Sequence, residues 1–183
     1  MNLLFRCFNC QNVNNLVKGY KTYVRPLLEY CTQVWSPYRI KDIKAIEGVQ
    51  RRFTKRLRGL ENLTYSDRLK ETSLETLTAR RTKHDLILTY KIIFGLTCLK
   101  SDEFYKLNST QTHITRGHMY KLALAPARTD VMKNSFICRT ICAWNSLPEA
   151  TDFSSLNAFK NSTNTLDLNI LHNSLCDIGY LFV

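Results

Sequence analysis

The sequence predicts an all-α protein, a bundle of about five to seven helices with one long loop near residues 107–132. Apolar residues recur at steps of three and four over most of the chain, which is the spacing of one buried helix face. Only six glycines and four prolines occur among the 183 residues, and hydrophobic residues make up 44% of them. This composition favours long regular elements, and a chain of this length can bury a core. We therefore expect one domain, with or without an appendage.

A first long helix is predicted over residues 13–35. Pro26 lies inside it and predicts a kink or a break, because proline removes a helical hydrogen bond. Trp35 falls on the apolar face, so we expect it to anchor the core. The apolar residues at helical spacing are Val17, Tyr20, Val24, Leu27, Leu28 and Val34.

A second long helix is predicted over about 38–58. Ser36 has the residue type of a cap, Pro37 suits the first helical position, and Gly59 suits the stop. One face of this helix is apolar and should be buried. The residues of that face are Ile43, Ile46, Val49, Phe53 and Leu57.

The same helix carries a cationic stripe almost opposite its apolar face, with Arg52 and Arg56 on the flank of the stripe. Like charges three or four residues apart repel by a few tenths of a kcal/mol per pair. Such a stripe favours a surface that faces phosphates, and the net charge of +11 also favours a polyanionic partner, either nucleic acid or an acidic membrane surface. A solvated basic face with counterions is the alternative. The stripe consists of Lys44, Arg51, Lys55 and Arg58.

Two further helices are predicted before the long loop. Residues 64–67, Thr-Tyr-Ser-Asp, form a capping box, so a short helix should run to about Thr72. A long helix is expected over 74–94, with Gly95 as its stop. Its second half is almost wholly apolar and is expected to be deeply buried, whereas its first half is basic, with Arg80, Arg81 and Lys83.

Residues 107–132 have no helical period and are predicted to form the long loop, with a short strand at 122–124. Two helices should follow. The first spans 133–146 and ends at Pro148, and the second begins at Ser154 or Ser155. The loop is a second basic region, with Arg116, His118, Lys121 and Arg128.

No pattern of an active site or a cofactor site occurs in the sequence. Cys7 and Cys10 form a single Cys-x-x-Cys without the second pair of a zinc ribbon. His113 and His118 have no compact cysteine pair beside them. Asp-Asp, Asp-x-Asp and glycine-rich phosphate loops are all missing. We therefore expect no catalytic residue, no metal and no cofactor in this chain.

The cellular setting is predicted from the cysteines and the hydropathy. Seven scattered cysteines without a secretory signal indicate reduced thiols in an intracellular protein, in the nucleus or the cytoplasm. No apolar stretch approaches the length of about 18 residues that indicates a membrane span. We expect no membrane partner.

Six stretches, in this order and spacing, resemble the C-terminal part of reverse transcriptases from jockey-like non-LTR (LINE-type) retrotransposons. The resemblance runs from about residue 3 to about 166, and the tail 167–183 has no recognised match. The stretches are "YKTYVRPLLEYCTQVWSPY", "IEGVQRRFTKRLRGL", "LTYSDRLKE", "LETLTARRTKHDLILTYKIIFG", "TRGH" and "AWNSLPEA".

The resemblance implies a thumb-like helical region of an RNA-directed DNA polymerase. The family's catalytic palm, with its Tyr-x-Asp-Asp type pair and divalent metal, has no counterpart in this chain. We expect binding of RNA, DNA or their hybrid without reading of base sequence. Two alternatives stay open: a part of a complete, active reverse transcriptase, or an inert retroelement relic. The residues expected to make the primary contacts with nucleic acid are Lys44, Arg51, Lys55 and Arg58, assisted by Arg52, Arg56, Arg80, Arg81 and Arg116.

Overall fold

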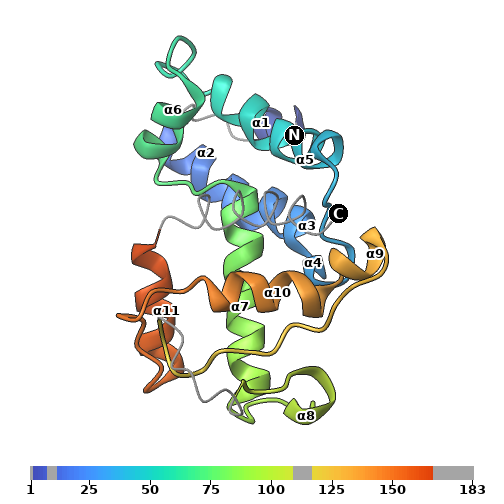
Figure 1. The fold of residues 1–183 in the computed structure, drawn as a ribbon. Helices are drawn as coiled ribbons and strands as arrows, with labels where there is room; N and C mark the ends of the chain where they lie inside the picture. The colour runs from blue at the N-terminus through green and yellow to red at the C-terminus, as the bar shows by residue number, and fades with distance from the viewer. Residues whose placement is uncertain (1, 8–11, 109–116, 167–183) are drawn as a thin grey trace. The chain divides into compact units, whose positions relative to one another are not determined.

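The structure, a computed structural model, describes residues 2–7, 12–108 and 117–166 (Figure 1). Within these residues the regular elements are helices, and the only β pairing is one isolated bridge between Leu107 and Leu122. This confirms the predicted all-α class. The predictions on Cys10, His113, Arg116 and the tail 167–183 fall outside the described residues.

The chain forms two compact units, residues 1–81 and 82–183. The boundary falls inside one long helix, α7 (Leu77–Ile93), and nothing in the sequence predicted it. The helices of the first unit before α7 are α1 (Asn2–Cys7), α2 (Val13–Gly19), the π-helical η1 (Tyr20–Val24), α3 (Arg25–Glu29), α4 (Thr32–Trp35), α5 (Ile40–Lys55) and α6 (Tyr65–Thr72).

Pro26 follows a turn with altered helical hydrogen bonding. The N–H of Arg25 donates to the carbonyl of Tyr20, five residues back, so η1 is a π turn. A proline ring crowds the carbonyl four residues earlier and offers no N–H, and a wider turn accommodates both defects. The predicted helix therefore changes its geometry before Pro26 and ends at Glu29, because Cys31 has a left-handed backbone with φ of 53°.

The helix α5 begins two residues later than predicted, and its start is not the predicted cap. Its N-cap is Arg39, which makes no side-chain cap hydrogen bond. The N–H of Ser36 donates to the carbonyl of Thr32, so Ser36 ends α4 and does not start α5. The helix also ends earlier than predicted, at Lys55 with Arg56 as its C-cap, and Gly59, with a φ of 84°, lies in the turn that follows.

The core of the first unit is built on α2, η1, α5 and α6. The ring of Tyr20 stacks on Phe53 with 4.4 Å between centroids, and both side chains are fully buried. The predicted core role of Trp35 is wrong: its side chain is 41% exposed, and its indole N–H donates to the carbonyl of Tyr30. The other buried members of this core are Leu4, Leu16, Val17, Leu57, Leu69 and Leu74.

Thr64 caps α6, as the predicted capping box requires of its first residue. The Thr64 hydroxyl accepts a hydrogen bond from the N–H of Asp67, and α6 ends at Thr72 as predicted. A left-handed Ser73, with φ of 49°, then turns the chain toward α7. These local signals place Tyr65, the first residue of α6, beside α5.

The second unit is held by an aromatic cluster. Trp144 and Phe159 are fully buried with 5.5 Å between ring centroids, and Tyr90 stacks on Phe159 at 4.7 Å. Trp144 is thus part of the core of this unit. Ser155 is the cap of the last helix, since its hydroxyl accepts from the N–H of Ala158. The helices here, besides most of α7, are α8 (Ser101–Phe104), α9 (Asp130–Lys133), α10 (Phe136–Asn145) and α11 (Leu156–Thr165).

The described part of the long loop is tied down by polar contacts. In place of the predicted strand at 122–124, only a bridge forms, with the N–H of Ala123 donating to the carbonyl of Lys106 at 2.8 Å. His118 is 5% exposed, and its Nε2–H donates to the carbonyl of Trp144 at 2.9 Å. His118 therefore has a structural role, and it does not extend a basic surface.

Candidate nucleic-acid interface

The cationic stripe predicted on the second long helix is solvent-exposed on α5 and the turn after it. The apolar residues Phe53 and Leu57, on the other side, are fully buried. The helical spacing therefore places the cations and the core on opposite faces, as predicted. Six of the predicted contact residues are exposed: Lys44, Arg51, Arg52, Lys55, Arg56 and Arg58.

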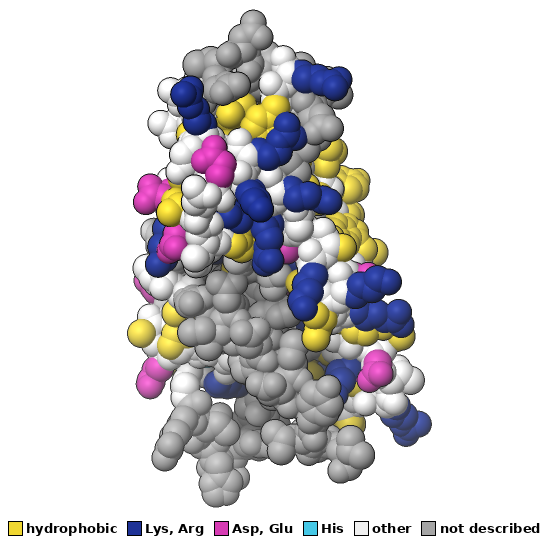
Figure 2. Space-filling view, turned by 90° about the horizontal axis from the view of Figure 1, so that it is seen from above, with side chains coloured by type: hydrophobic (Ala, Val, Ile, Leu, Met, Phe, Trp, Pro, Cys, Tyr) yellow, Lys and Arg dark blue, Asp and Glu magenta, His cyan; other side chains and the backbone are white. Residues whose placement is uncertain are grey.

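Figure 2 views the protein from the side on which α5 and α6 lie in Figure 1. Dark blue Lys and Arg side chains recur over the described surface, and magenta acidic side chains are fewer in this view. Among described residues, no carboxylate lies within ion-pair distance of Lys44, Arg52, Lys55 or Arg58. These charges remain available to an external anion.

Two arginines of this face lie over aromatic rings. The guanidinium carbon of Arg51 lies 4.8 Å from the centroid of Tyr65, and that of Arg56 lies 4.3 Å from the centroid of Phe5. A cation over a ring keeps its full charge while its side chain loses freedom. The rings therefore orient these arginines without neutralising them.

A buried polar network holds α5 in place beneath its cations. Gln50 is fully buried; its carbonyl accepts from the Tyr20 hydroxyl at 3.0 Å, and its amide donates to the Tyr65 hydroxyl at 3.2 Å. The same amide also donates to the carbonyl of Glu75 at 2.9 Å. A buried amide with satisfied partners fixes one arrangement of the surrounding elements.

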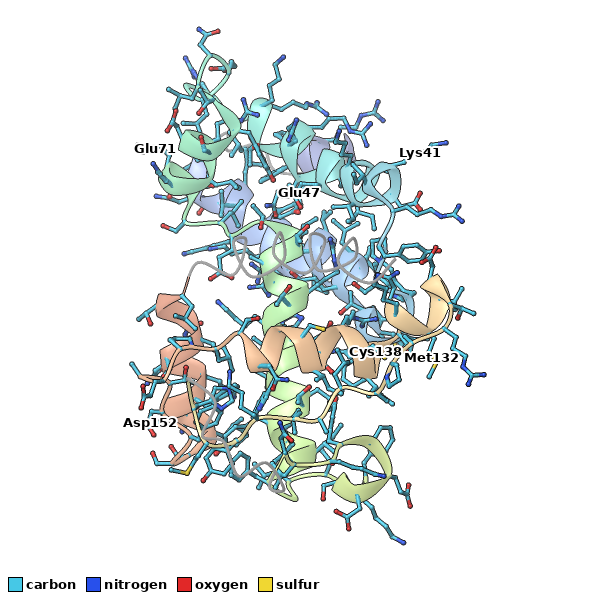
Figure 3. All side chains as sticks on the ribbon, in the orientation of Figure 1. Lys41, Glu47, Glu71, Met132, Cys138 and Asp152 are labelled. Atoms are coloured by element: carbon cyan, nitrogen blue, oxygen red, sulfur yellow. The ribbon has the colours of Figure 1, made fainter. Side chains whose placement is uncertain are left out.

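Glu47 extends this network to the start of α7. Figure 3 shows Glu47 on α5, and its carboxylate accepts a hydrogen bond from the Tyr65 hydroxyl and another from the N–H of Leu77 at 3.0 Å. A carboxylate at the start of a helix accepts a hydrogen bond from an N–H that has no partner within the helix. Its negative charge also interacts favourably with the positive end of the helix dipole. Burial and the bond to Glu47 raise the pKa of Tyr65, so its hydroxyl stays a donor at neutral pH.

Arg80 and Arg81, predicted to assist, do not join the exposed cations. Arg80 forms an ion pair with Glu29, with a second hydrogen bond of 3.0 Å, and the contact with Glu29 raises the pKa of Arg80. Arg81 is only 3% exposed and donates to the Thr78 hydroxyl at 3.0 Å. Arg80 is paired with an acid and Arg81 is buried, so the prediction that these two residues assist the exposed cations is corrected.

Two features of this face were not predicted. Lys41 lies three residues before Lys44, is exposed, and extends the stripe toward the start of α5 (Figure 3). Gly48 occupies the stripe position between Lys44 and Arg51, and a Cβ placed there would meet nothing within 4 Å. The helical step that defined the stripe also selects both positions, so the sequence contained this signal.

No described residues suggest a metal centre. No group of three or more His, Cys, Asp or Glu side chains that could hold a metal ion occurs in the part of the chain that the structure describes. Within the same residues, no helix has both the length and the apolar character needed to cross a bilayer.

Comparisons with known proteins give one partial similarity. No family profile matches the chain, and no solved structure matches it. The chain is 30% identical over 95 residues to a Caenorhabditis elegans protein described as "Uncharacterized protein B0403.1". The aligned part is 50% of this chain and 48% of that protein, so the chain spans about half the length of the curated relative that it matches. That description names no activity.

Proposed function

We propose that this chain binds nucleic acid through the exposed cations of α5, by contacts to phosphates and without reading base sequence. The observation that carries the proposal is a same-sign stripe on a helix that a buried network holds fixed. Backbone phosphates provide most of the affinity of such binding and carry no direct sequence information. The primary contacts are Lys44, Arg51, Lys55 and Arg58, with Arg52 and Arg56 beside them.

The sequence resemblance supports a more specific version of the proposal. In a thumb-like region of a retrotransposon reverse transcriptase, a basic helix would grip the template–primer duplex of RNA and DNA. Polymerase chemistry, with its divalent metal, would then belong to a palm elsewhere in a longer protein. An inert relic with a basic, solvated α5 is the competing interpretation, and the two differ in one measurable property.

That property is salt-dependent binding to an RNA–DNA hybrid duplex. Four phosphate contacts predict a slope of about −3.6 for log K against log salt, or roughly a hundredfold loss between 50 and 200 mM. The slope should flatten when Lys44, Arg51, Lys55 and Arg58 are all replaced by alanine. Fluorescence anisotropy of a labelled hybrid across a salt series measures both.

A matched control removes the same amount of charge elsewhere. Replacing the exposed lysines Lys18, Lys70, Lys100 and Lys106 by alanine lowers the net charge equally but leaves the stripe intact. This variant should keep most of the affinity of the unmodified chain. Equal loss in both variants would mean that net charge alone attracts the duplex, and absence of binding by the unmodified chain would reject the proposed function.

A further inference from the structure

A group of aromatic side chains lies exposed in the first unit, just before the cationic stripe in sequence. Tyr23 is 66% exposed and Tyr30 is 77% exposed, while Trp35 and Tyr38 are 41% and 42% exposed. Large apolar side chains that gather on a surface are unusual and mark interaction sites. We refer to these four residues as the aromatic surface.

Two of these rings share one exposed side of the helix. Tyr23, Leu27 and Tyr30 follow one another at steps of four and three along η1 and the end of α3 and are exposed, whereas Tyr20 at the start of η1 is buried. The helix then breaks at the left-handed Cys31. Tyr23, Leu27 and Tyr30 therefore lie along one side of the helix, turned away from the core.

One ring of the aromatic surface is fixed by a hydrogen bond. The indole N–H of Trp35 donates to the carbonyl of Tyr30 at 2.6 Å, across the break between α3 and α4. This bond satisfies the polar end of the indole within the chain. The remaining edge and face of the ring are left for an apolar or aromatic partner.

The charges around the aromatic surface are mostly positive. The guanidinium carbon of Arg39 lies 5.8 Å from the ring centroid of Tyr38, and Arg39, Lys41 and Lys44 are all exposed. The carboxylate of Glu29 is bound by Arg80, and the exposed Asp42 offsets one of these charges. Rings and cations therefore alternate at the approach to the stripe.

We propose that the aromatic surface binds an unpaired nucleic-acid strand, whose bases stack on the rings while its phosphates contact Arg39, Lys41 and Lys44. This inference rests on the proposed function, because it continues the same basic face. Single-stranded nucleic acid is recognised by aromatic platforms within a positive groove, and stacking tolerates any base sequence. A purely apolar protein partner would leave the cations unmatched.

The two tryptophans provide a direct test of stacking. Trp144 is fully buried and Trp35 is 41% exposed, so quenching of tryptophan fluorescence by bound bases reports on Trp35. Titration of the full chain with an oligothymidylate strand should quench part of the emission. The Trp35→Phe variant should lose the quenching but keep its affinity within about twofold, because a stacking ring remains.

Paired variants separate base stacking from apolar docking. Tyr30→Ala with Tyr38→Ala should weaken binding of the oligothymidylate roughly five- to a hundredfold and leave binding of the hybrid duplex unchanged. The control, Leu27→Ala with Val34→Ala, removes exposed aliphatic side chains from the same region, 78% and 82% exposed, and should leave both affinities unchanged. Sedimentation velocity of each variant reports the oligomeric state.

The outcomes distinguish this inference from the proposed function. Salt-dependent binding of the duplex without quenching by the single strand would refute strand binding by the aromatic surface and would leave the proposed function unaffected. Absence of both duplex binding and quenching would reject both proposals. If the chain self-associates and the aliphatic variant abolishes that association, the surface is an interface between two copies, and the inference fails.

Discussion

Two sets of cations in the first unit differ in their surroundings. Arg51, Arg52 and Lys55 on α5 are exposed, whereas Arg80 and Arg81 at the start of α7 are engaged within the protein. Both sets look alike in the sequence, as basic residues in a helix with an apolar face. The difference shows that a cation is a candidate ligand for phosphate only when it is neither buried nor bound by another group of the protein.

The largest effect should come from the engaged set. Arg80→Ala leaves the carboxylate of Glu29, whose side chain is only 11% exposed, without its closest partner. We expect a loss of about 3 kcal/mol in the free energy of unfolding, because a mostly buried charge is left uncompensated. Urea unfolding measures the change.

The matched variant for that experiment is Arg52→Ala on α5. It should change the free energy of unfolding by less than about 0.5 kcal/mol, since it removes an exposed charge from the surface. Equal destabilisation by the two variants would remove the distinction between the two sets of cations.

A smaller effect is expected at Gly48, in the middle of the exposed stripe. Gly48→Ala should stabilise the protein by about 0.5–1 kcal/mol, because glycine is costly inside a helix and the new Cβ meets no atom. If a phosphate backbone approaches α5 closely there, the same variant will weaken binding of the duplex while it raises the melting temperature. Unchanged binding would mean that the strand lies farther from the helix backbone and is contacted only by the long Lys and Arg side chains.

The smallest effect concerns a buried base that must stay neutral, His118. Burial lowers the pKa of His118, and the nearby Lys121 lowers it further, against the opposing effect of the bond to Trp144. The unfolded chain therefore takes up a proton first as the pH falls. Stability should be full above about pH 6.5 and should decline below it, toward the lowered pKa of the folded state.

Melting temperatures measured at pH 7.5 and pH 5.5 test this prediction. His118→Gln keeps a donor toward the carbonyl of Trp144 and removes the titrating group. The pH dependence of this variant should be smaller than that of the unmodified chain. An identical pH dependence would assign the acid sensitivity to other groups.

The sequence predicted most of the local structure where the signals are local. The helix cap at Thr64 and the opposite faces of α5 each depend on residues within a few positions of each other. Helical spacing alone separated Lys55 from Phe53, and the structure confirms that separation. For such features, the sequence pattern and the interactions that stabilise the structure involve the same residues, which lie close together in sequence.

Features that depend on distant partners were not predicted. Arg80 is engaged by Glu29, which lies 51 residues away in sequence. Trp35 sits on an apolar helical pattern, but the break at Cys31 removes the helix that would have turned it inward. The pair Ser36-Pro37 has the composition of a cap but ends one helix instead of starting the next. Nucleic-acid binding itself stays a prediction.

The π turn at residues 20–24 has a consequence for insertions and deletions. A π turn holds about one residue more than an α turn, and one residue corresponds to about 100° of helix rotation. Deleting a single residue there would restore an α turn and leave the residues after it facing nearly as before, because the π turn already accommodates one residue more. A deletion within the α-helical α3 has no such extra residue to remove, and it would turn Tyr30 by about 100° relative to Tyr20 although no aromatic residue had been substituted. The orientation of this surface is thus encoded in the count of residues as well as in their identity.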